Sequence, residues 1–226
     1  MPPPGRRWWR GVLRRLEGAY GRRAWEGGSG PVGELIGTIL SQNTTGANAS
    51  AGLRRLRERF GSWSAVADAP VRRIERCIRV AGLGRVKAPR IRAILRAIRD
   101  RTPGRSVSLA FLRDWPDERA YEYLLAFGGV GPKTAACVLM FAFGRKLFPV
   151  DTHVRRIAIR LGALPEGCPL PRAQETLTPQ IAPADRYGLH VLLIAHGRAC
   201  CRARRPQCKD CPLPELCAFG LRACAR

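Results

Sequence analysis

Helical periodicity is the sequence feature that most constrains the fold of this chain. Apolar residues recur every three or four positions through most of the 226 residues, and no segment shows strict apolar–polar alternation bounded by turn residues. The pattern predicts an all-α protein of about ten short helices. The predicted helices cover residues 7–20, 32–40, 47–60, 70–80, 88–98, 118–127, 132–143, 152–161, 171–181 and 187–199.

The charge of the chain is one-sided. Its 40 Lys and Arg residues stand against 17 Asp and Glu, which gives a formal net charge of +23. A basic excess of this size indicates a polyanionic partner such as a nucleic acid. Arginine outnumbers lysine strongly, a bias typical of a GC-rich genome, so each lysine attracts interest. The lysines are Lys87, Lys133, Lys146 and Lys209.

The sequence offers no membrane-spanning or secretory segment. Its longest apolar run, residues 135–143, is shorter than the ~18 residues that a membrane span needs. The first seven residues lack the apolar stretch of a signal peptide. We therefore expect a soluble, intracellular protein, in which nine cysteines suggest metal binding rather than disulfides.

Four of those cysteines lie close together near the C-terminus. Cys201, Cys208, Cys211 and Cys217 have the spacing C-x6-C-x2-C-x5-C, and four thiolates this close can surround one metal centre. Structural zinc sites usually pair two C-x2-C knuckles, whereas one knuckle between wider loops favours a 4Fe–4S cluster. Zinc, or no metal, stays open on spacing alone. Cys200 adjoins the first ligand and could compete with it.

The loop between the first two of these cysteines is strongly basic. It carries Arg202, Arg204 and Arg205 within a few residues. Three arginines on a loop fixed by a metal centre would form a phosphate-binding surface. A solvated basic loop without a partner is the alternative.

A glycine-rich turn precedes the helix predicted at residues 132–143. Gly128, Gly129 and Gly131 permit a tight turn with positive φ, and Pro132 suits the first helical position. The amides of the turn and of the helix N-terminus would form an anion site that holds a DNA phosphate without reading a base. An ordinary turn between two helices is the alternative.

Lys133 stands at the second position of that helix. A cation there opposes the helix dipole, and the same field favours the neutral amine, which is a nucleophile. A simple contact between this lysine and a phosphate is the alternative. Arginine, which is always charged, could make that contact but could not act as a nucleophile.

Asp151 could act together with this lysine. It precedes a predicted helix, so an N-cap is its other interpretation. The helix 132–143 is about 18 Å long and residues 145–150 can span about 20 Å, so the chain can return to bring the carboxylate beside the amine. A Lys–Asp pair in a basic protein suits cleavage of an N-glycosidic bond, because the amine can attack C1′ while the carboxylate stabilises the developing charge.

Several segments, taken in order, resemble the endonuclease III family of helix–hairpin–helix DNA glycosylases. They are LSQNTT at 40–45, GLGRVKA at 82–88, GVGPKTA at 129–135, VDTH at 150–153 and HGR at 196–198, followed by the four cysteines. The resemblance runs from about residue 31 to residue 217. It implies a 4Fe–4S cluster rather than zinc, Lys133 as Schiff-base nucleophile and Asp151 as its acidic partner.

The resemblance also implies an architecture. A six-helix barrel domain with the helix–hairpin–helix would span 33–146, a helical iron–sulfur cluster domain would comprise 1–32 and 147–226, and the catalytic cleft would lie between them. Gln42 and Asn43 would occupy the gap left by a flipped nucleotide, with Asn43 standing where the family often has Gln. Leu83 would be a wedge that replaces lost stacking, its alternative being a turn residue packed on its own helix.

The function expected from the resemblance is base excision repair. We predict a monomeric DNA glycosylase with β-lyase activity at abasic sites, which excises damaged bases, oxidised pyrimidines above all, from duplex DNA. It would be cytoplasmic and associated with the nucleoid of a bacterial cell. A monofunctional mismatch or modified-base glycosylase is the second hypothesis, and a non-catalytic iron–sulfur DNA-binding protein is the third.

Overall fold

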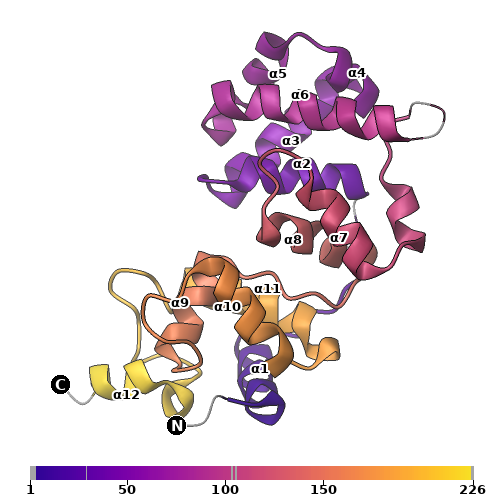
Figure 1. Ribbon diagram of the computed structural model, residues 1–226. Coiled ribbons are helices and arrows are strands. Elements are labelled where there is room, and N and C mark those ends of the chain that lie inside the picture. The colour runs from indigo at the N-terminus through magenta and orange to yellow at the C-terminus, as the bar shows by residue number, and fades with distance from the viewer. Residues whose placement is uncertain (1–3, 29, 103, 105, 225–226) are drawn as a thin grey trace. The chain divides into compact units, whose positions relative to one another are not determined.

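The computed structural model describes residues 4–28, 30–102, 104 and 106–224, with the side chains of 223 and 224 outside that description. Its secondary structure in these residues is helical, without a strand, so the predicted all-α class is confirmed (Figure 1). The chain divides into two compact units. We call residues 27–145 the central unit and residues 1–26 with 146–226 the terminal unit.

The central unit contains seven α-helices and two short 3-10 helices among its described residues. They are α2 (Pro31–Ser41), α3 (Gly46–Phe60), α4 (Trp63–Asp68), α5 (Val71–Ile78), η1 (Arg79–Ala81), α6 (Gly84–Arg101), η3 (Ala110–Asp114), α7 (Asp117–Leu125) and α8 (Pro132–Phe143). Helix α2 packs mainly against α8 and α3, and α6 packs against α4 and α5. Both α2 and α8 are apolar on most of their surface, as central helices of a bundle must be.

The terminal unit joins the two ends of the chain. It contains α1 (Arg6–Tyr20), α9 (Thr152–Arg160), α10 (Leu170–Leu177), η4 (Thr178–Gln180), η5 (Pro183–Asp185), α11 (Arg186–Ala199), η6 (Pro214–Leu216) and α12 (Ala218–Cys224). Figure 1 shows the indigo α1 beside the orange α11, and the two helices pack together. Their fully buried Leu16 and Leu192 belong to one apolar core that also takes in Ile157 of α9.

The boundaries of the two units differ from those of the predicted domains by six residues at one end and one residue at the other. The central unit begins at Gly27 and ends at Arg145, whereas the sequence suggested 33 and 146. The difference at the first boundary has a packing cause. The backbone of Gly28 lies so close to α8 that an added Cβ would come within 2.6 Å of the Cα of Ala142. Residues just before α2 therefore belong with the central unit.

Local chemistry explains where predicted and observed helices differ. The six-residue helix α4 was not predicted, because it is too short for periodicity, although Ser62 caps it by accepting from the amide of Ala65 at 3.1 Å. Helix α12 was not predicted either. The helix predicted at 171–181 ends at Leu177, because the next turn is a 3-10 turn around Pro179, which has no N–H to donate. Among the described residues, no helix is both long and apolar enough to span a membrane.

Candidate active site and metal centre

The hairpin between α7 and α8 depends on one glycine rather than three. Gly129 has φ +83°, and a Cβ there would collide with the side chain of Arg90. The prediction of positive φ is wrong for Gly128 and Gly131. Gly131 is extended, with φ −96° and ψ 178°, because it is the N-cap residue of α8 and its carbonyl accepts from the amide of Ala135 at 3.0 Å. The predicted position of Pro132 at the start of α8 is confirmed.

Lys133 lies on the first turn of α8, half-buried, with an acidic neighbour that the sequence analysis missed. The neighbour is Glu34 on α2, whose carboxylate interacts electrostatically with Lys133. Burial raises the pKa of Glu34, while the hydrogen bond from Thr38 Oγ1 to Glu34 Oε1 at 3.2 Å and the charge of Lys133 act in the opposite direction. The sequence does contain a sign of this neighbour, because Glu34 is the one charged residue in the otherwise uncharged sequence of α2.

Asp151 is the N-cap of α9 in the terminal unit. Its Oδ1 accepts from the amide of Val154 at 2.8 Å, so the capping interpretation holds. The cap uses one of the two carboxylate oxygens and does not itself exclude a second role. Lys133 belongs to the central unit and Asp151 to the terminal unit.

The loop after α2 separates the roles of Gln42 and Asn43. Gln42 is turned toward its own unit, since its Nε2 donates to the carbonyl of Gly129 at 3.3 Å and its Oε1 accepts from Arg90 at 3.4 Å. Asn43 is exposed and has φ +55°, the left-handed region that few non-glycine residues adopt. Of the two, Asn43 is therefore the side chain placed to project outward.

Leu83 occupies an equally unusual position. It precedes α6 as its N-cap residue, with φ +51°, and its relative exposure is 53%. This exposure does not fit a turn residue packed on its own helix. A large apolar side chain held outward in this way is available for burial against a binding partner.

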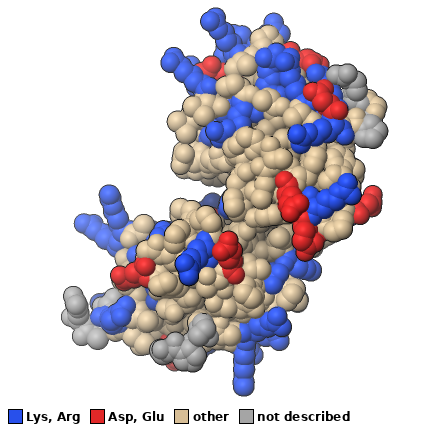
Figure 2. All heavy atoms as spheres, viewed as in Figure 1, with Lys and Arg blue, Asp and Glu red and all other residues tan. Residues whose placement is uncertain are grey.

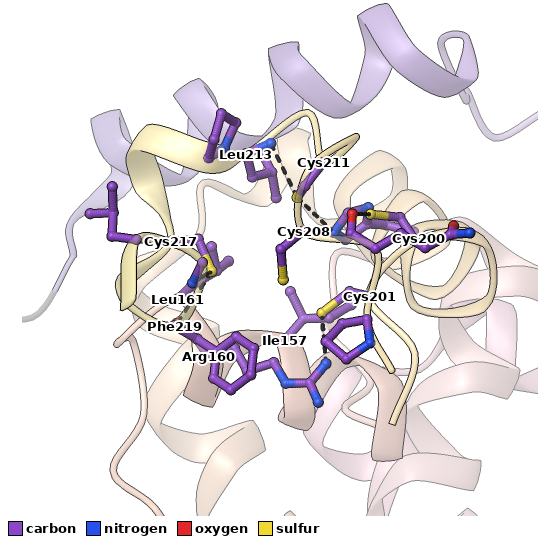
Figure 3. Close-up of a pocket in the computed structure, with 16 residues that line it drawn as sticks. Ile157, Arg160, Leu161, Cys200, Cys201, Cys208, Cys211, Leu213, Cys217 and Phe219 are labelled. Atoms are coloured by element: carbon purple, nitrogen blue, oxygen red, sulfur yellow. Dashed lines mark hydrogen bonds between the residues drawn. The ribbon is translucent and has the colours of Figure 1, made fainter. Parts of the chain in front are cut away.

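The four predicted metal ligands line one cavity of about 300 Å³ in the terminal unit. Figure 3 shows Cys201, Cys208, Cys211 and Cys217 around this space, together with apolar side chains that include Leu161 and Phe219. The cavity therefore assembles four thiol ligands in a largely apolar setting. Cys201 and Cys217 are buried, and Cys208 and Cys211 are half-buried.

Hydrogen-bond donors surround these sulfurs. Arg160 Nη1 donates to Cys201 Sγ at 3.2 Å, the amide of Leu213 donates to Cys211 Sγ at 3.4 Å, and the amide of Gly220 donates to Cys217 Sγ at 3.3 Å. Donors aimed at sulfur stabilise thiolates, which are the form that binds iron or zinc. The residues present therefore fit a four-thiolate metal centre.

Cys200 and His196 offer further atoms that could bind a metal, and they line the same cavity. Their ligand atoms and that of Cys211 lie within 4.8 Å of one another. Cys200 Sγ donates to the carbonyl of Gln207 at 3.2 Å, and burial raises the pKa of this thiol to about 12. Burial lowers the pKa of His196 to about 4, and its Nδ1 lies 2.9 Å from the hydroxyl of Tyr20. Cys200 thus has a backbone hydrogen bond, and His196 has Tyr20 as a partner.

The basic loop beside the cavity is anchored by its backbone. Arg160 donates to the carbonyls of Arg202 at 2.7 Å and Ala203 at 3.1 Å. The side chains of Arg202, Arg204 and Arg205 are exposed. Figure 2 shows blue Lys and Arg side chains projecting widely from the face in view, with few red acidic ones between them. An anchored loop with exposed arginines is a fitting surface for phosphates.

Comparison with known proteins places these features in context. Residues 36–181 match the HhH-GPD superfamily of base excision DNA repair proteins. An endonuclease III of Sulfolobus acidocaldarius is 35% identical over 189 residues, which cover 83% of this chain and 81% of the relative. A solved non-covalent complex of an endonuclease III with DNA is similar at a TM-score of 0.81 and 28% identity, covering 96% of this chain and 97% of that one. A trapped covalent intermediate of an endonuclease III with DNA is similar at a TM-score of 0.80 and 30% identity, covering 95% and 96%.

Proposed function

This chain belongs to the HhH-GPD superfamily of base excision DNA repair proteins and within it to the endonuclease III family, and from that premise we propose its reaction and the residues that perform it. The protein is a bifunctional DNA glycosylase and lyase, which removes a damaged base from duplex DNA and cleaves the strand at the abasic site. The catalytic roles proposed below rest above all on the position of Lys133. Its amine lies on the first turn of α8, directly after the glycine hairpin.

The proposed reaction runs through Lys133. Its Nζ forms a bond to C1′ of the sugar as the bond from C1′ to the base breaks, and the base leaves with the bonding electrons and takes up a proton. The sugar ring then opens to an imine between Nζ and C1′. Loss of a proton from C2′ breaks the C3′–O bond, which nicks the strand by β-elimination.

We propose that Asp151 supplies the carboxylate of this reaction. The sugar gains positive charge as the base departs, and a carboxylate stabilises that charge and can accept the proton that the attacking amine loses. Its cap to Val154 fixes the side chain on a rigid helix end. The hairpin amides around Gly129 and Gly131 would hold a phosphate of the same strand.

We propose that the cavity in the terminal unit holds a 4Fe–4S cluster. Cys201, Cys208, Cys211 and Cys217 would be its ligands, supported by the N–H donors to three of their sulfurs. Such a cluster, when bound, cross-links four points of the chain and can exchange single electrons. The loop with Arg202, Arg204 and Arg205 would then contact DNA phosphates from a fixed base.

The proposed substrate is duplex DNA that contains an oxidised pyrimidine or an abasic site. Asn43 and Leu83 would fill the space that the flipped nucleotide leaves, because both are exposed and held on left-handed residues. The enzyme would act as a monomer at the nucleoid of a bacterial cell, in the cytoplasm.

One experiment tests this assignment against its alternatives. Purified protein is treated with borohydride in the presence of abasic duplex DNA, and base release from a duplex with an oxidised pyrimidine is measured alongside. We expect a covalent adduct and base release with the wild type, and neither with Lys133→Gln. Lys146→Gln is the matched control, because Lys146 is exposed and has no proposed role. Base release without an adduct would instead indicate a monofunctional glycosylase, and DNA binding alone a non-catalytic protein.

A further inference from the structure

Lys87 is a buried lysine that the proposed chemistry does not use. It lies on the first turns of α6 in the central unit, and its relative exposure is only 2%. A lysine is rarely buried to this extent unless partners satisfy its ammonium group. Here the partners are three backbone carbonyls. Nζ donates to the carbonyl oxygen of Leu40 at 2.8 Å, of Gln42 at 2.7 Å and of Ala81 at 2.9 Å.

These three carbonyls lie at the ends of two helical segments that are distant in sequence, and each segment leads into a loop. Leu40 and Gln42 lie at the C-terminal end of α2, and Ala81 ends the 3-10 helix η1. Asn43, with φ +55°, directly follows Gln42, and Leu83, with φ +51°, follows Ala81 after one intervening glycine. Among the other described non-glycine residues, only Arg205, in the terminal unit, has a positive φ. The ammonium of Lys87 thus binds one residue before Asn43 and two residues before Leu83.

The site requires a lysine in its charged form. An ammonium has three N–H donors, one for each carbonyl, whereas a neutral amine has two. Burial lowers the pKa of Lys87, and the three carbonyl dipoles act against that shift because they favour the charge. The flat guanidinium of arginine cannot converge on three carbonyls around one nitrogen. The chain keeps lysine here although arginine is its usual cation.

Gln42 extends the same arrangement to the hairpin. Its carbonyl accepts from Lys87, and its side chain bonds the carbonyl of Gly129 at 3.3 Å. The loop with Asn43, the loop with Leu83 and the hairpin before α8 are therefore connected through two side chains. A change at Lys87 would reach all three.

We infer that Lys87 is a positioning residue that holds Asn43 and Leu83 in the left-handed conformations from which both side chains capture the damaged nucleotide. The inference rests on the proposed function. Left-handed backbone costs conformational energy at Leu83 above all, since asparagine adopts it more readily than other non-glycine residues, so a free loop would leave it. A clamp that pre-sets both residues removes the cost of ordering them at the moment when the base is unstacked.

The inference predicts a selective defect in Lys87→Met. Methionine has a similar length and no donor, so it leaves the loops unclamped. Excision of a base from intact duplex needs unstacking, and it should slow by about tenfold, the factor that one hydrogen bond to a charged group provides. Nicking of a preformed abasic site needs less unstacking and should change much less. The measured quantity is the ratio of the two single-turnover rates.

A matched control separates positioning from loss of stability. Ile91→Ala also alters a fully buried side chain of α6 but removes no contact to either loop's carbonyls. It should lower the melting temperature, as Lys87→Met should, and leave the ratio of rates unchanged. If Lys87→Met lowers both rates by the same factor, as a loss of folded protein would, the inference is overturned.

A second measurement judges the clamp without DNA. Amide hydrogen exchange of the free protein should become faster at residues 40–45 and 81–84 in Lys87→Met, and not in Ile91→Ala. Unchanged exchange at either loop would overturn the inference. This measurement also separates the proposed function from the role of Lys87. If the wild type neither releases a base nor forms an adduct, the proposed function is refuted. The exchange result still decides whether Lys87 holds the two loops.

Discussion

At the scale of single residues, Lys133 offers the clearest distinction between a nucleophile and a phosphate contact. Lys133→Arg keeps the positive charge at the start of α8 but cannot form an imine, because the guanidinium stays protonated. We expect this variant to bind abasic DNA nearly as well as the wild type and to nick it at least ~100-fold more slowly, with no borohydride adduct. A trappable adduct from Lys133→Arg would contradict the mechanism.

Asp151 has an observed capping role and a proposed catalytic role, and one substitution separates them. Asp151→Asn keeps an oxygen that can accept from the amide of Val154, so α9 should retain its cap and the protein its melting temperature. The amide cannot stabilise a sugar cation or accept a proton, so base excision should fall by about 10²–10⁴-fold. Unimpaired excision in this variant would leave Asp151 with its capping role alone.

Glu34 makes a pH dependence of stability predictable. Burial raises the pKa of Glu34 above its ordinary value of 4.5, so in the window between 4.5 and the raised value the folded protein binds a proton that the unfolded chain does not. The contribution of Glu34 to the free energy of unfolding therefore falls as pH rises through that window.

The matching variant is Glu34→Gln, which stays neutral throughout. Urea unfolding of both proteins from about pH 4 to pH 7 should show the wild type losing stability relative to the variant as pH rises. A difference that does not vary with pH would mean that Glu34 has no raised pKa.

At the scale of elements, the sequence predicted helices well where termini carry strong local signals. Helix α8 has the predicted bounds, because Pro132 begins it and Gly144, with φ +69°, follows it. Helix α6 begins four residues before the predicted start. Residues 84–87 form its first turn, and they were missed because they show no apolar periodicity. Helix α4 was missed because six residues cannot display a period.

The site residues divide in the same way. Motif spacing brought out Lys133, Asp151 and the four cysteines, because their neighbours in sequence carry the pattern. Glu34, Lys87 and His196 received no role, because their partners lie on other helices. Lys87, for example, binds carbonyls of residues 40, 42 and 81, and no local pattern reveals that a carbonyl will point at a lysine.

The hairpin yields a prediction at this scale. Gly129→Ala would place a Cβ on a residue with φ +83° and against Arg90, so we expect a loss of about 1–3 kcal/mol in the free energy of unfolding. Gly128→Ala is the control, because Gly128 has no positive φ and has nothing within 4 Å of an added Cβ. It should change stability by less than about 0.5 kcal/mol. Equal losses in denaturant titrations would contradict this reading of the turn.

At the scale of the whole molecule, the proposed 4Fe–4S cluster and the net charge each yield a prediction. Protein purified without oxygen should contain iron and acid-labile sulfide, and Cys217→Ala should lose both. Cys200→Ala should retain them, because the Cys200 thiol is bonded to the carbonyl of Gln207. Zinc without iron in the wild type, or loss of iron from Cys200→Ala, would show that the ligand set is different.

The net charge of +23 predicts that DNA binding is dominated by phosphate contacts. The logarithm of the affinity should then fall linearly with the logarithm of salt concentration, by about 0.9 for each phosphate neutralised. Arg202, Arg204 and Arg205 lie on the basic loop beside the cavity. If each of them contacts one phosphate, replacing all three with glutamine should reduce the slope by about 2.7. Fluorescence anisotropy of a labelled duplex at several salt concentrations measures the slope.

A second triple variant decides whether position or total charge matters. Arg55, Arg59 and Arg76 are exposed arginines of the central unit, and replacing them with glutamine removes the same three charges. Counterions are released only where side chains meet phosphates, so this variant should keep most of the wild-type slope if these arginines lie outside the interface. Equal slopes for the two triple variants would mean that the arginines of the basic loop contribute no more to phosphate binding than those of the central unit. An unchanged slope in the loop variant would remove Arg202, Arg204 and Arg205 from the interface altogether.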